Sequence, residues 1–321
     1  MRLALLTLLA LMWSLPAGAV GFQRAELPDP QGGTLELAIW YPADAPTAPH
    51  RLGPYTQPVA TDAAIRGHGL ALVLLSHGSG GNLANHVDTA LALAEAGFVV
   101  AALSHKGDST DDLSLSGTTR GLANRPRQYV LALDWLLESW PGHSQLDPRR
   151  VGGFGHSAGA FTVLVAAGGE PNLGRIPLHC ATQPADPSCR LGRPGEGIPQ
   201  HVNWAHTPRL RALVVAAPAL GYTFVPQGLA QVTQPVQLWR SSRDEVLLHP
   251  WHAQQVRNGL TGPVEFQEVG GAGHYAFLAP CPAGMAAAVP EICTDLPGFD
   301  RTRFHLGFNA ALVAFFQDRL K

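Results

Sequence analysis

The sequence predicts an α/β domain built on a mostly parallel, twisted sheet with helices on both of its faces. Short apolar runs of strand length alternate along the chain with segments whose apolar residues recur at helical spacing. Several of these runs are apolar throughout, as expected for strands that are buried on both faces of a parallel sheet. Helices then lie on both faces, because each crossover between parallel strands carries a helix back over the sheet.

Each predicted element depends on a local signal. The first strand alternates and ends at a proline, and residues 43–68 after it are rich in Pro, Ala and Thr, which predicts a surface loop. A glycine at position 97 ends the first helix, and an Asp-Pro pair at 147–148 turns the chain into the central strand. The predicted strands cover 34–42, 70–75, 98–103, 150–154, 212–217, 235–239 and 264–269, and the predicted helices cover 85–96, 125–140, 161–167 and 304–320.

The first 19 residues predict a secretory signal peptide. Arg2 precedes an apolar core over residues 3–13, and Pro16 with the small residues 17–19 supplies a cleavage site after Ala19. A membrane anchor is the alternative, but it needs about 20 apolar residues, and this core is shorter. Since no later apolar run is long enough to span a bilayer, we expect a secreted or periplasmic protein with one domain over residues 20–321.

Composition limits the classes of partner and indicates disulfides. The chain of 321 residues has a formal net charge of −2, so it lacks the basic face that binds nucleic acid. An even set of four cysteines in an exported chain indicates disulfides. Three connectivities are open, and closeness in sequence favours Cys180–Cys189 and Cys281–Cys293. Neither pair has C-x-x-C spacing, so zinc binding is the weaker alternative.

The candidate nucleophile is Ser157, within the stretch Gly155-His156-Ser157-Ala158-Gly159. An apolar run precedes this stretch and a helix-like run follows it, so the serine is expected on a sharp strand-to-helix turn. Such a turn strains the backbone and needs neighbours without bulk, which the two glycines supply. The hydroxyl then lies at a helix N-terminus, whose dipole favours developing negative charge. A Gly-rich structural turn is the alternative interpretation.

Two backbone N–H groups are the expected donors to an oxyanion. The stretch Ser76-His77-Gly78-Ser79-Gly80-Gly81-Asn82 follows the strand that ends at position 75, and a Gly-rich loop lets the backbone approach a substrate closely. The expected donors are the N–H groups of Ala158 and Ser79, with Gly80 as the nearest rival. A phosphate-binding loop is the competing interpretation, but the lysine of that motif is absent.

An acid and a base follow two further strands. Asp244 comes after the strand that ends at position 239, where a carboxylate can orient a histidine. Glu245 is the rival acid, and a helix N-cap is the structural alternative for Asp244. His274 follows the last strand beside three glycines, which let its ring reach Ser157. The order Ser, Asp, His, each after a strand, predicts that His274 is the general base and acid.

A proline-rich segment over residues 168–208, here called the cap segment, follows the helix after Ser157. A loop this long inside a compact domain is usually functional. Its prolines and its expected disulfide predict a stiff cover with little apolar surface, and therefore a preference for short acyl groups. Trp204, Trp251 and Tyr275 are the predicted substrate-binding residues.

His105 and Asp108 follow the strand that ends at position 103. We expect a surface loop there, with a pocket wall or a second polar network as the alternative. The 14 histidines of the chain are scattered without an H-E-x-x-H motif, so no metal site is predicted.

These motifs carry a resemblance to a known family. His77-Gly78-Ser79-Gly80-Gly81, the turn around Ser157, Asp244 and Gly273-His274 resemble the α/β-hydrolase fold. Within it they look most like the bacterial group of predicted dienelactone hydrolases, which is similar to platelet-activating factor acetylhydrolases. The resemblance covers essentially the whole mature chain. Dienelactone hydrolases use a cysteine where this chain has Ser157, and acetylhydrolases usually show another glycine where it has Ala160.

The resemblance implies a catalytic domain that cleaves small-molecule carboxylic esters through a Ser-His-Asp acyl-enzyme, without a cofactor. A polyester hydrolase or lipase shares every catalytic residue and is the nearest alternative, followed by a peptidase. From other classes, the alternatives are a catalytically silent binding module that keeps the fold and a histidine-based metal carrier. Fold alone does not choose among these functions.

Overall fold

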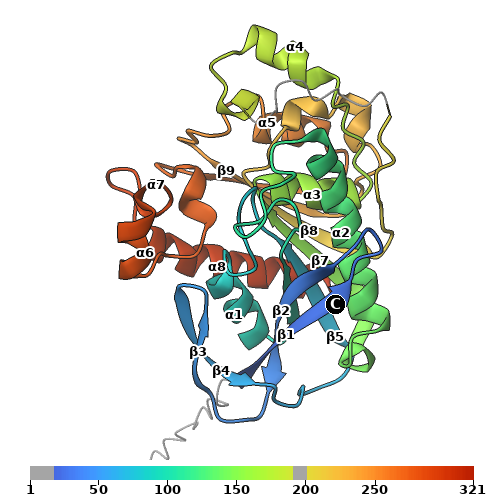
Figure 1. Ribbon diagram of the computed structural model, residues 1–321, viewed down its shortest axis with the longest axis vertical. Coiled ribbons are helices and arrows are strands. Elements are labelled where there is room, and N and C mark those ends of the chain that lie inside the picture. The colour runs from blue at the N-terminus through green and yellow to red at the C-terminus, as the bar shows by residue number, and fades with distance from the viewer. Residues whose placement is uncertain (1–17, 191–200) are drawn as a thin grey trace, which may run out of the picture.

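A computed structural model describes residues 18–190 and 201–321, so nearly all of the predicted signal peptide lies outside the described residues. Ten strands of the described chain form one sheet in the order β10-β9-β8-β7-β5-β6-β2-β1-β4-β3 (Figure 1). The strands are β1 (Ala19–Pro28), β2 (Thr34–Ala43), β3 (Ala48–Leu52), β4 (Tyr55–Thr61), β5 (Leu70–Ser76), β6 (Val99–Leu103), β7 (Leu146–His156), β8 (Leu210–Ala216), β9 (Val236–Ser241) and β10 (Val264–Val269). The helices are α1 (Val87–Glu95), α2 (Thr119–Glu138), α3 (Ala158–Ala166), α4 (Arg175–Thr182), α5 (Ala253–Gly259), α6 (Ala283–Ala288), α7 (Pro290–Cys293) and α8 (Arg301–Arg319).

The predicted parallel sheet is confirmed in its central part. The strands β6, β5, β7, β8, β9 and β10 pair in parallel, while β2 pairs antiparallel with both β6 and β1. All carboxyl ends of the parallel strands therefore lie along one edge of the sheet. Each of the four loops that the sequence marked out for chemistry leaves the sheet at this edge.

Helices cover both faces of the sheet and bury two apolar cores. On one face, α2, α3 and α5 share one apolar core with alternate residues of β5 such as Leu72 and Leu74. On the other face, α1 and α8 pack against the intervening residues Ala71, Val73 and Leu75. A strand that is apolar on both sides is thus buried on both sides, as its continuous apolar run predicts.

The structure corrects the prediction of a surface loop over residues 43–68. Within that range, β3 and β4 pair antiparallel, and β4 joins the sheet through β1. The helix predicted from position 125 begins earlier, at Thr119, because the Thr118 side chain caps it by accepting a hydrogen bond from the Gly121 N–H.

Both predicted disulfides are present, Cys180–Cys189 in the cap segment and Cys281–Cys293 around α6 and α7. Figure 1 shows α4 of the cap segment beyond the carboxyl edge of the sheet, with α6 and α7 standing to one side of the molecule. In the described parts of the chain, no helix has the length and apolar character needed to cross a membrane.

Candidate active site

Ser157 occupies the sharp turn between β7 and α3. Its backbone has φ 56° and ψ −121°, a left-handed conformation that is rare outside glycine. Backbone hydrogen bonds to β8 and the loop after it hold it, since Ser157 N–H donates to the Ala216 carbonyl at 2.9 Å and the Ser157 carbonyl accepts from Ala219 N–H at 3.1 Å. Ala217 and Leu220, which flank that acceptor loop, also have positive φ values of 42° and 55°. Of the four non-glycine residues with positive φ in the described chain, three therefore lie at or near this turn, and the fourth is Asp62.

The two glycines of the turn are required by close backbone contacts. A Cβ atom on Gly155 would lie 2.2 Å from the Gly159 carbonyl oxygen, and one on Gly159 would lie 1.9 Å from the Ser76 carbonyl oxygen. Neither position has room for a side chain. The pattern of small residues around Ser157 is therefore set by the approach of α3 to the ends of β5 and β7.

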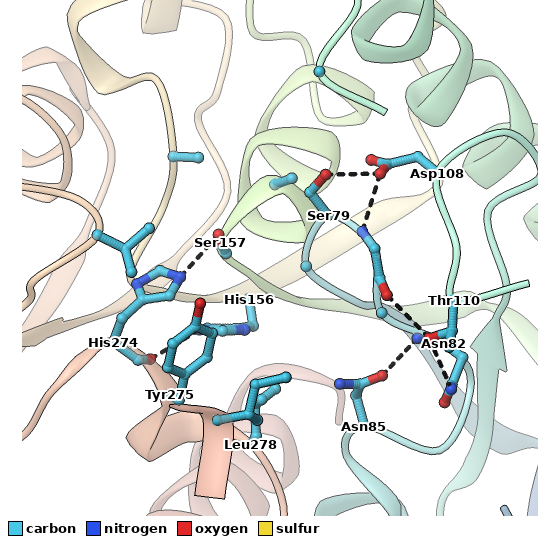
Figure 2. Close-up of a pocket in the computed structure, with 18 of the residues that line it drawn as sticks. Ser79, Asn82, Asn85, Asp108, Thr110, His156, Ser157, His274, Tyr275 and Leu278 are labelled. Carbon is cyan, nitrogen blue, oxygen red and sulfur yellow. Dashed lines mark hydrogen bonds between the residues drawn. The ribbon is translucent and has the colours of Figure 1, made fainter. Parts of the chain in front are cut away.

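Ser157, His274 and Asp244 form a continuous hydrogen-bonded series (Figure 2 shows the serine and the histidine). His274 Nε2 lies 3.1 Å from Ser157 Oγ, and His274 Nδ1 lies 2.9 Å from Asp244 Oδ2. Because a carboxylate only accepts, Nδ1 carries the proton and Nε2 is free to accept the proton of the serine hydroxyl. This arrangement can activate a hydroxyl as a nucleophile.

Asp244 is fixed and charged, and it makes both the contact with His274 and the capping contacts that the sequence offered as alternatives. Its Oδ1 accepts from the N–H groups of Val246 at 3.0 Å and Leu247 at 2.7 Å, which caps the turn that follows β9. Burial raises the pKa of Asp244, but His274 and these N–H donors outweigh burial and hold the pKa below its usual value. The rival acid Glu245 contacts the histidine elsewhere, accepting from the His274 backbone N–H at 3.0 Å.

In the loop after β5, the backbone N–H groups of Ser79 and its rival Gly80 differ in whether they are free to bind an oxyanion. Gly80 N–H donates to Asp108 Oδ1 at 3.0 Å, and the Ser79 hydroxyl donates to the same oxygen at 2.7 Å (Figure 2). The Gly80 N–H is therefore occupied. Within the described chain, the backbone N–H groups of Ser79 and Ala158 make no hydrogen bond, so they are the pair left for a ligand.

A buried arginine connects this loop to the helix after Ser157. Arg125 is 1% exposed, and its Nη1 donates to Asp108 Oδ2 at 2.7 Å while its Nε donates to Thr162 Oγ1 at 3.1 Å. Its Nη2 donates to the His77 carbonyl. The Thr162 hydroxyl in turn donates to the Ala158 carbonyl at 2.8 Å. One guanidinium thus joins the segments that carry both free N–H groups.

The expectation of a surface loop at His105 and Asp108 was wrong, because both side chains are buried in polar networks. Asp108 lies under Arg125, and His105 bonds to Ser76 Oγ at 2.7 Å through Nε2 and to Gln128 Oε1 at 3.1 Å through Nδ1. Burial raises the pKa of Asp108, but Arg125 and the hydrogen bonds hold it below its usual value. Both alternatives considered for this loop are observed, since the two side chains lie in a polar network and Asp108 also lines the cavity over Ser157.

Buried histidines near the site carry no charge at neutral pH. Burial and the nearby Arg125 lower the pKa of His77 to about 3. Burial lowers the pKa of His86 to about 4 and holds those of His105 and His156 well below the usual value. These imidazoles therefore add no positive charge to the surroundings of Ser157.

A cavity of about 520 Å³ opens over Ser157 and His274. Of the predicted substrate-binding residues, Tyr275 lines it, whereas Trp204 and Trp251 do not. Trp204 is half-buried and packs edge-on against Phe161 of α3, 5.9 Å between ring centroids, because α3 presents an apolar surface to it. Trp251 lies against a histidine of the cap segment. Apart from histidines and the two tyrosines Tyr55 and Tyr275, Asp108 is the ionisable residue among the described residues that line the cavity.

The described part of the cap segment is attached to the body by a buried carboxylate, which the sequence did not single out. Asp186 Oδ2 accepts from His179 Nε2 at 2.9 Å and from His252 Nε2 at 3.1 Å. His252 Nδ1 accepts from the Leu220 N–H at 3.0 Å. Leu220 and Ile176 of α4 both line the cavity. The attachment through Asp186 therefore fixes the cavity wall that the cap segment forms. No cluster of three metal-binding side chains occurs in the described chain.

The order of parallel strands, with a serine on the turn after β7, defines the α/β-hydrolase fold. Among solved structures, the chain is similar to a ferulic acid esterase from Streptomyces cinnamoneus, with a TM-score of 0.66 and 18% identity, covering 96% of this chain and 91% of that one. It is also similar to a cold-adapted esterase from an Arctic intertidal metagenomic library, with a TM-score of 0.52 and 18% identity, covering 94% and 95%. At this identity the likeness concerns the fold. No family model matches the chain, and neither does any curated protein.

Proposed function

We propose that this protein is an exported serine hydrolase that cleaves carboxylic esters. The observation that carries the proposal is the series from Ser157 Oγ to His274 to Asp244, with separations of 3.1 Å and 2.9 Å, at the floor of a cavity. The esterase names of two proteins with this fold favour ester cleavage over other acyl transfers. The two disulfides and the signal peptide predicted over residues 1–19 support export.

In the proposed mechanism, Ser157 attacks the ester carbonyl while His274 takes the hydroxyl proton. Asp244 orients the ring and stabilises the imidazolium. The developing oxyanion accepts hydrogen bonds from the N–H groups of Ala158 and Ser79. His274 then protonates the leaving alcohol, and water repeats the sequence on the acyl-enzyme.

The substrate is a neutral small-molecule ester, because the described cavity walls are largely apolar and offer no free cation to bind an anionic substrate. The narrower likeness to predicted dienelactone hydrolases and acetylhydrolases is part of the same proposal, with serine as the nucleophile. The preference for short acyl groups was predicted with three aromatic residues around the pocket, and of these only Tyr275 lines the cavity. The proposal of ester cleavage does not depend on this preference, so acyl length is tested separately.

A fluorophosphonate probe and an ester panel test this proposal together. We expect the wild-type protein to be labelled and to hydrolyse p-nitrophenyl esters, and we expect Ser157→Ala to lose both properties while it keeps the native circular dichroism. Wild-type protein that is neither labelled nor active would indicate the silent binding module. Activity that rises with acyl length or at an oil–water interface would indicate a lipase, and cleavage of amides in preference to esters would indicate a peptidase.

A further inference from the structure

Residues 281–293, here called the disulfide lobe, contribute to the cavity without belonging to the core. The lobe consists of α6, α7 and the bridge between Cys281 and Cys293. No residue of the lobe is buried, in contrast to the long helices α2 and α8 and to the central strands. Three of its half-buried side chains, Met285, Val289 and Ile292, nevertheless line the cavity that contains Ser157.

The lobe faces apolar residues from a distant part of the chain. Pro54 and Tyr55, at the β3–β4 turn, line the same cavity, and the Tyr55 hydroxyl donates to the Ala279 carbonyl at 3.4 Å, just before the lobe begins. Leu278, which follows the 3₁₀ turn of His274, also lines the cavity. The side chains that line this end of the cavity carry no formal charge. Such a surface binds an uncharged apolar group by removing it from water.

Few interactions fix the position of the lobe. Besides the Cys281–Cys293 bridge, Arg301 at the start of α8 donates from Nη2 to the Ile292 carbonyl at 2.8 Å and from Nε to Asp295 at 2.9 Å. Arg301 is itself 4% exposed. A segment without buried residues cannot hold its shape by packing alone, so the bridge and this arginine, together with the contact of Met285 with the apolar core, determine where its three apolar side chains lie.

We propose that the disulfide lobe is the specificity-determining wall of this site. It forms a subsite for a bulky, uncharged apolar group on one half of the ester, and the Cys281–Cys293 bridge keeps that subsite in shape. The inference rests on the proposed ester hydrolysis, and it adds a selectivity for bulk that the Ser-His-Asp arrangement does not imply.

Met285→Trp, which fills the subsite, tests the proposal. The quantity to measure is the ratio of kcat/KM for a bulky ester to that for the smallest ester. One series varies the acyl half from acetate to benzoate with a constant alcohol, and the other varies the alcohol half from methyl to benzyl with a constant acyl group. We expect the ratio to fall by about 10-fold or more in one series, the range that pocket contacts supply. The series that responds identifies which half of the ester the lobe binds.

Matched controls separate the lobe from general effects. Leu178→Trp, at an exposed leucine of α4 that does not line the cavity, should keep the wild-type ratio. Cys281→Ser with Cys293→Ser should lower the ratio, whereas Cys180→Ser with Cys189→Ser should lower it less. A wild-type ratio in both series for Met285→Trp overturns the proposal even if the cysteine variants do not fold. A wild-type protein that cleaves no ester overturns the proposed function instead.

Discussion

Replacing Arg125 by methionine should reveal how strongly one buried ion pair supports the site. The side chains of Arg125 and Asp108 are 1% and 7% exposed, so the variant leaves a carboxylate buried without its countercharge. Removing one partner of such a pair costs about 3–5 kcal/mol. The hydrogen bonds that Asp108 keeps from Ser79 and Gly80 place the expected loss near the lower value, about 3 kcal/mol in the free energy of unfolding at pH 7.

The same variant should lower kcat, because Asp108 would no longer hold the loop that carries the Ser79 N–H in place. Losing an oxyanion donor outright costs about 10²–10³ in kcat, so a displaced donor should cost about 10–100-fold. Urea denaturation and p-nitrophenyl acetate hydrolysis measure the two effects. Arg127→Met is the matched control, since it removes another arginine of α2, paired with Asp29 and 24% exposed, and should leave kcat unchanged.

The loss of stability should also depend on pH. In the intact protein the pKa of Asp108 lies below its usual value, so its contribution is present above the unfolded pKa and is lost as pH falls through the folded pKa. Without Arg125, burial dominates and raises that pKa, so the deficit should shrink between pH 7 and pH 5 as the carboxyl takes up a proton. A deficit below about 1 kcal/mol at pH 7, with wild-type kcat, would refute this account.

Three further substitutions have defined outcomes. Ser157→Ala should reduce ester hydrolysis by about 10³ or more with no loss of folding, and residual activity of more than a few per cent would exclude Ser157 as nucleophile. Asp244→Asn should lower kcat, but less than His274→Ala, whereas Glu245→Gln should retain most activity; the reverse order would make Glu245 the acid. Gly159→Ala should prevent folding or displace the turn, because its Cβ would lie 1.9 Å from the Ser76 carbonyl oxygen. Thermal melting of that variant is compared with Gly284→Ala, a helical site where a Cβ would meet no atom within 4 Å.

Local sequence signals predicted the elements that depend on local chemistry. The continuous apolar run at 70–75 and the glycines around Ser157 predict β5 and the sharp turn, because burial on both faces and lack of space act at those residues. The edge rule for parallel sheets then predicted that Asp244 and His274 would lie near Ser157. Their placement follows from topology and needs no knowledge of side-chain packing.

Features that depend on distant partners were not predictable in this way. The strands β3 and β4 look like loop in sequence because their prolines and threonines gain a regular conformation only by pairing with each other and with β1. Arg125 carries a charge, which usually indicates an exposed helix face, and only its tertiary partner Asp108 explains its burial. Trp204 was predicted to line the cavity, but it packs against Phe161 of α3 instead. The sequence alone does not show which of these two apolar surfaces a tryptophan will contact.

The left-handed backbone at Ser157 has a consequence for protein engineering. A non-glycine residue held at such a φ value costs about 1–3 kcal/mol. Ser157→Gly should therefore recover part of that free energy while removing the hydroxyl of the proposed nucleophile. A library selected by melting temperature alone would then enrich a variant without the proposed nucleophile. Glycine at Ala217, whose φ is also positive, should gain stability for the same backbone reason. Thermostabilisation of this protein should be selected by turnover after heating.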